Sequence, residues 1–151
     1  MADEDHEERL QRETMELLNE LRVVLPGVQV LLAFLLTAPF NQRFSQLDDG
    51  QEAAYFTSLA GTTVAVALLI APTTYHRIRF RSRDKERLLR LGNAFVVVGT
   101  AFLAAAMTTA VGLVTDLVYG GAWTWVVAVL TAVLLAGLWY ALPLSRQASD
   151  D

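Results

Sequence analysis

Four long stretches of this chain carry no charged side chain. They cover residues 23–42, 53–75, 91–115 and 117–145, and the shortest is 20 residues long. An α-helix rises about 1.5 Å per residue, so each stretch is long enough to cross a hydrocarbon layer about 30 Å thick. Stretches of about 10 to 14 residues would have indicated buried helices of a soluble protein instead. The sequence therefore predicts four membrane-spanning helices.

The expected fold class is an all-α membrane protein, a four-transmembrane-helix bundle with an N-terminal cytoplasmic amphipathic helix. We expect that helix over residues 1–25, the transmembrane domain over 23–145 and a cytoplasmic tail over 146–151. The predicted spans are about 23–40, 53–75, 91–115 and 122–142. A chain of 151 residues with 54% hydrophobic side chains leaves no room for a soluble catalytic domain.

Lysine and arginine are distributed unevenly among the segments that flank the spans. Residues 1–22, 77–90 and 146–151 hold eleven of the twelve cations, and Arg43 is the remaining one. An excess of Lys and Arg marks the cytoplasmic side of a membrane protein. Both termini and the connection over 76–90 are therefore expected in the cytoplasm, and the other two connections outside.

The segment before the first span has an apolar face with helical spacing. Its members are Leu10, Thr14, Leu17, Leu18, Leu21 and Leu25. Pro26-Gly27 follows, and we expect it to break or kink the helix at the membrane surface. The apolar face can pack against the protein's own spans or dock on another protein, and the sequence does not decide between them.

The same segment is acidic, with eight acids against three arginines in residues 1–22. It is expected on the same side of the membrane as the basic connection. We therefore predict that Glu13, Glu16 or Glu20 lies near the stretch Arg79 to Arg90. Exposed ion pairs contribute only about 0–1 kcal/mol, so apolar packing must dominate this contact.

The basic connection is the densest charged feature of the chain. Its cations are Arg77, Arg79, Arg81, Arg83, Lys85, Arg87 and Arg90. They are sufficient to orient the protein, and they are also candidate contacts for anionic lipid headgroups or a partner protein. Only Phe80 is interleaved with them, so we do not expect nucleic-acid binding.

Polar side chains inside the spans are few, and none near a span's middle is ionisable. This argues against a proton- or ion-coupled transporter, which needs such groups at depth. Gln29 and Asn93 are the candidate intramembrane packing residues. An amide without a partner is costly in hydrocarbon, so Gln29 is expected to face another helix and to bond Asn93 or a threonine.

The residues needed for catalysis or metal binding are scarce. The chain has no cysteine, and its two histidines, His6 and His76, lie at an acidic tail and a basic rim. No nucleophile with a neighbouring base and no metal-ligand pattern is apparent. We expect no catalytic, cofactor-binding or metal site, and we expect that the protein is not an enzyme.

Small residues at spacings of four predict where helices approach closely. The pairs are Gly61 with Ala65, Ala101 with Ala105, and Thr108 with Gly112, together with the series Ala128, Ala132 and Ala136. Such faces pack the four spans together or join two copies of the chain, and the first arrangement is favoured.

Three segments of the chain have a recognisable sequence: residues 16–40 (ELLNELRVVLPGVQVLLAFLLTAPF), 70–77 (IAPTTYHR) and 83–87 (RDKER). They resemble a family of small four-span bacterial membrane proteins, common in actinobacteria, to which no function is assigned. The resemblance extends over nearly the whole chain. It implies a four-span membrane protein, which we expect in the bacterial plasma membrane, and it transfers no activity, cofactor or catalytic residue.

These observations lead to two functional hypotheses. The first is a non-catalytic interaction or accessory protein of the plasma membrane, with anionic lipid, a membrane partner protein or a second copy as partners. The alternative is a small transport or permeation protein that acts as an oligomer. A continuous polar track formed by Gln29, Asn93 and the threonines would favour the alternative.

Overall fold

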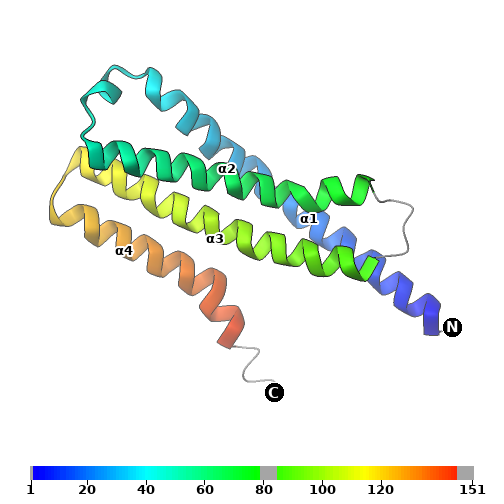
Figure 1. Cartoon of the computed structure of the whole chain (residues 1–151). Helices are drawn as coiled ribbons and strands as arrows, with labels where there is room; N and C mark the ends of the chain where they lie inside the picture. The colour runs from blue at the N-terminus through cyan, green and yellow to red at the C-terminus, as the bar shows by residue number, and fades with distance from the viewer. Residues whose placement is uncertain (1, 79–84, 146–151) are drawn as a thin grey trace. The chain divides into compact units, whose positions relative to one another are not determined.

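The computed structural model describes residues 2–78 and 85–145, and it is helical almost throughout (Figure 1). The main helices are α1 (Ala2–Thr37), α2 (Asp49–Ile78), α3 (Lys85–Val118) and α4 (Ala122–Ala136). Two short 3₁₀ segments, η1 (Ala38–Phe40) and η2 (Gln42–Gln46), join α1 to α2, and a π-helical turn, η3 (Gly137–Ala141), follows α4.

Four helical segments are long and apolar enough to cross a membrane. They are Glu8–Phe40, Asp49–Tyr75, Leu89–Val118 and Ala122–Ser145. The described residues contain no β-strand. The all-α class and the four long apolar helices predicted from the uncharged stretches are thus confirmed.

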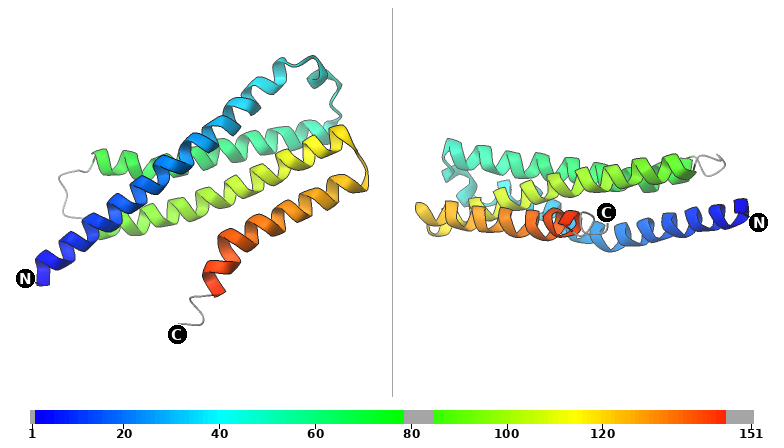
Figure 2. Two further views of the ribbon diagram at one scale, coloured as in Figure 1. Left: turned by 180° about the vertical axis from the view of Figure 1, so that it is seen from behind. Right: turned by 90° about the horizontal axis from the view of Figure 1, so that it is seen from below.

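Of the break or kink expected at Pro26-Gly27, the break is wrong. Helix α1 continues through Pro26 and is drawn as one uninterrupted coil in the left view of Figure 2. A proline removes one backbone hydrogen bond, which packing on either side can outweigh. Leu21 and Val28 supply that packing, because each is at most 3% exposed and they lie seven residues apart on one face.

The chain forms two compact units. The first contains Met1–Phe34 and Thr62–Phe102, and the second contains Leu35–Gly61 and Leu103–Asp151. Helices α1, α2 and α3 each contribute one part to either unit. We describe the packing of each unit separately.

In the first unit, glycines of α3 allow the close approach of neighbouring helices. A Cβ on Gly92 would lie 3.0 Å from Cδ2 of Leu17 in α1 and 3.6 Å from Cβ of Pro72 in α2. A Cβ on Gly99 would lie 3.2 Å from Cβ of Leu68 and 3.2 Å from Cγ of Leu69. Lipid tails are as apolar as the side chains of a helix, so the hydrophobic effect does not drive membrane helices together. Close packing of their backbones is instead a main source of helix association in membranes.

The buried face of α2 in this unit repeats at spacings of three and four. Its members are Thr62, Ala65, Leu69 and Pro72. This is the pattern of a helix that packs along its length against neighbours. Ala65 was expected at such a face and is fully buried, which confirms that packing prediction.

In the second unit, a tyrosine joins the end of α1 to α2. Pro39 has no N–H to donate to the carbonyl of Leu35, four residues earlier in the chain. The hydroxyl of Tyr55 donates to that carbonyl at 2.8 Å, and the Tyr55 ring stacks edge-on against Phe44. The contact satisfies a backbone group at a helix end, where the helix itself offers no donor.

Helices α2, α3 and α4 also meet in this unit. Ser58 is fully buried and donates its hydroxyl proton to the carbonyl of Ala106 at 2.9 Å. A Cβ on Gly112 would lie 3.4 Å from Cβ of Ala128, so Gly112 and Ala128 are at a helix contact as expected. The expected packing role of Ala101 and Ala105 is wrong within the chain, because both are exposed.

Candidate functional site

An open groove lies between α1 and α3 in the first unit. It has a volume of about 370 Å³. Helix α1 lines it with Glu13, Glu16, Leu17 and Glu20, and α3 lines it with Leu89, Arg90 and Asn93.

Helical spacing explains why these residues share one groove. The α1 residues lie three, one and three positions apart, which places them on one side of two successive turns. Arg90 and Asn93 are likewise three positions apart on α3. The contact of Leu17 with the bare backbone of Gly92 brings the two helices together at the base of the groove.

Most polar groups of the groove are exposed at the surface of the chain. Glu16, Glu20, Arg90 and Asn93 are all exposed, whereas Leu17 is half-buried. Three carboxylates and one guanidinium give the lining a net negative charge. The predicted approach of the α1 acids to the basic stretch is confirmed for Arg90, which lines the same groove as Glu13, Glu16 and Glu20.

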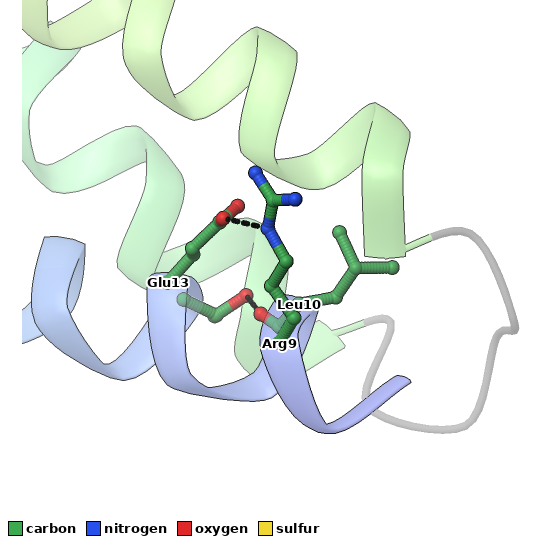
Figure 3. A network of polar contacts seen from close by, with 4 residues as sticks. Arg9, Leu10 and Glu13 are labelled. Carbon is green, nitrogen blue, oxygen red and sulfur yellow. Dashed lines mark hydrogen bonds and ion pairs between the residues drawn. The ribbon is translucent and has the colours of Figure 1, made fainter. Parts of the chain in front are cut away.

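Local contacts on α1 hold the first acid of the groove in place. The Nε of Arg9 donates to a carboxylate oxygen of Glu13 at 2.8 Å, and the hydroxyl of Thr14 donates to the carbonyl of Leu10 at 2.7 Å (Figure 3). The Arg9 side chain is 68% exposed, so water screens this ion pair and it adds little to stability. Its effect is to orient Glu13 along the helix surface.

The structure describes only some of the remaining cations of the basic connection. Arg77 and Arg87 are exposed at the ends of α2 and α3. Lys85 begins α3, but its side chain lies outside the description. Arg79, Arg81 and Arg83 lie outside the described residues, so the role expected for them in lipid or partner contact stays a prediction.

The two amides predicted to pack inside the membrane behave differently from the expectation. Asn93 lies in the groove beside Arg90 and is exposed. Gln29 is exposed on α1, and no hydrogen bond joins its side chain to another described residue. Val28 and not Gln29 occupies the face of α1 that is buried within the chain, so the expected contact of Gln29 with another helix stays a prediction.

A second polar cluster joins three helices in the second unit, and sequence reasoning missed it. Both carboxylate oxygens of Asp116 accept a hydrogen bond, one from the amide of Gln51 and one from the hydroxyl of Thr124, each at 2.8 Å. These side chains come from the start of α2, the end of α3 and the start of α4. Asp116 and Gln51 are 65 positions apart, so no local pattern could have paired them.

The groove and the Asp116 cluster differ in what they can do. Both carboxylate oxygens of Asp116 already accept hydrogen bonds within the chain, so that cluster holds helix ends together. In the groove, the exposed carboxylates of Glu16 and Glu20 can make ion pairs and hydrogen bonds with a bound molecule. Among the described residues, no group of three His, Asp or Glu side chains could hold a metal ion.

Comparison with known protein families shows which family the chain belongs to. A family model described as a family of unknown function, DUF6328, matches residues 3–143. The chain belongs to this family. The match confirms the resemblance seen in the sequence, and it covers three of the four apolar helices and all but the last two residues of the fourth. No curated protein and no solved structure matches the chain.

Proposed function

We propose that this protein is a non-catalytic interaction or accessory protein of the bacterial plasma membrane. The observation that carries the proposal is the groove of Glu13, Glu16, Glu20, Arg90 and Asn93, an accessible charged surface next to an apolar helix contact. A partner protein is its occupant in this proposal. The family assignment gives no activity that would favour another class of function.

The distribution of cations supports a cytoplasmic position for the groove. Six of its seven lining residues come from the segments that precede the first and third uncharged stretches, and Asn93 lies just inside the third stretch. The two preceding segments hold ten of the twelve Lys and Arg residues. In the proposed topology, both termini and the groove face the cytoplasm. Arg77, Arg87 and the other cations of the basic connection then contact anionic lipid headgroups, at roughly 1 kcal/mol each.

The hydroxyls of the spans support the interaction hypothesis over a transport pathway. Thr57, Thr100, Thr109, Thr115 and Thr131 each donate to a carbonyl three or four residues earlier in their own helix. A hydroxyl bonded in this way has its donor engaged within the helix. Asn93 belongs to the surface groove, so it does not extend a polar track through the span.

Site-specific photocrosslinking in native membranes tests the proposal. A photoreactive residue in place of Glu16 should capture one discrete partner protein. The same replacement at Asn19, which is exposed on α1 but does not line the groove, is the matched control and should not. Replacing Glu13 and Glu20 by Gln should abolish the Glu16 crosslink.

Two results would contradict the proposal. One is an identical crosslinking pattern at positions 16 and 19. The other is a Glu16 crosslink that survives neutralisation of Glu13 and Glu20, because the captured protein would then not depend on the charge of the groove.

A further inference from the structure

Gln29 is a polar side chain exposed at hydrocarbon depth. It lies seven residues after Arg22, which ends the charged segment, and fourteen before Arg43. The first separation places it about 10 Å along the helix from Arg22, and α1 ends at Thr37, before Arg43 is reached. The amide therefore sits well inside the first span, where water does not reach a lipid-facing side chain.

This position is costly unless a partner is present. A carboxamide carries two N–H donors and an acceptor oxygen, and leaving them unsatisfied in hydrocarbon costs several kcal/mol. Lipid tails offer neither donors nor acceptors. Among the described residues, none hydrogen-bonds the Gln29 side chain, so the chain itself does not offset the cost.

The neighbours of Gln29 suit close contact with another helix. Pro26 and Ala33 lie three and four positions away, on the same side of α1, and both are exposed. We call Pro26, Gln29 and Ala33 the Gln29 face. Ala33 is small enough to let a second backbone approach, and Pro26 has no N–H to donate to the carbonyl of Arg22. Both features lie away from the buried residues Leu21 and Val28.

We infer that the Gln29 face of α1 binds the same face of a second copy of this chain. The second copy is the occupant because a carboxamide is complementary to itself. Across a two-fold axis, each Gln29 donates an N–H to the oxygen of the other, so both amides gain a donor and an acceptor together. The interface is independent of the partner groove, which lies before the span on α1.

Cysteine crosslinking in native membranes tests the contact directly, because the natural chain contains no cysteine. In full-length protein, Ala33→Cys should form a disulfide-linked dimer on mild oxidation. Phe34→Cys is the matched control, since it is 66% exposed and one residue further along but turned by about 100° around the helix. It should remain monomeric.

A second measurement tests the role of the amide. Gln29→Leu should lower the dimer association constant, measured by energy transfer between labelled copies in liposomes, by about three- to tenfold, because interhelical hydrogen bonds in membranes are weak. Gln29→Asn keeps the carboxamide and should retain part of the association. Thermal unfolding of each variant checks that the monomer is folded.

Several results would overturn the inference. Absence of the Ala33→Cys dimer, or equal crosslinking at positions 33 and 34, would remove the interface. An unchanged association constant in Gln29→Leu would show that the amide has no part in it. Rapid reaction of Gln29→Cys with a membrane-impermeant thiol reagent would place Gln29 in water, and not at a dry contact between two copies.

Discussion

Single residues decide how closely the helices of this protein approach. Gly92 and Gly99 are buried, and each leaves a space that a larger side chain would have to share with Leu17, Pro72 or Leu69. Tyr55 acts differently, because its hydroxyl donates a hydrogen bond to the carbonyl of Leu35. Pro39 leaves that carbonyl without its usual helical donor. Packing and hydrogen bonding at these positions are therefore specific to the residue present.

Tyr55→Phe tests the hydrogen bond while keeping the ring against Phe44. The substitution leaves the Leu35 carbonyl without the phenol donor, so we expect a loss of about 1 kcal/mol of stability. Thermal unfolding in detergent measures it. Tyr119→Phe removes a hydroxyl from a side chain that is 77% exposed and should leave the melting temperature unchanged. Equal melting temperatures for all three proteins would contradict the assigned role of Tyr55.

Gly99→Leu tests the close approach of α3 to α2. Adding a side chain where a Cβ already lies 3.2 Å from Leu68 and Leu69 should destabilise the protein by about 1–3 kcal/mol. Ala101→Leu is the matched control, because Ala101 is exposed on the same helix two residues away. A Gly99→Leu protein that melts at the temperature of the Ala101→Leu protein would show that α3 does not pack on α2 through this glycine.

At the scale of the helices, the sequence predicted the elements well and their contacts less well. Long uncharged stretches reveal spans because charge is costly in hydrocarbon, and the four helices followed from that rule. The continuity of α1 through Pro26 did not, since it depends on packing of Leu21 and Val28 that only the fold provides.

Contacts between helices were predicted where a small residue had another four positions away. Ala65 and Gly112 were found in this way. Gly92, Gly99 and Ala106 were missed because they recur every seven residues, a spacing that a search for pairs four apart overlooks. That seven-residue period is the signal that could have identified the buried face of α3.

At the scale of the whole molecule, the sequence predicted the charged groove in part and did not predict the Asp116 cluster. Charge segregation indicated that acids of α1 and a cation of α3 would meet, and Arg90 does line the groove with Glu13, Glu16 and Glu20. The cluster of Asp116, Gln51 and Thr124 could not be foreseen, because hydrogen-bond partners far apart in sequence are set by how the helices pack.

The central claim is that the four helices cross a membrane with the groove in the cytoplasm. Cysteine accessibility in intact cells tests it most directly, using Asp49→Cys, Glu16→Cys and Ser149→Cys one at a time in the cysteine-free chain. A membrane-impermeant maleimide should label position 49 in intact cells, and positions 16 and 149 only after permeabilisation. Labelling of positions 16 and 149 in intact cells, with position 49 protected, would contradict the account.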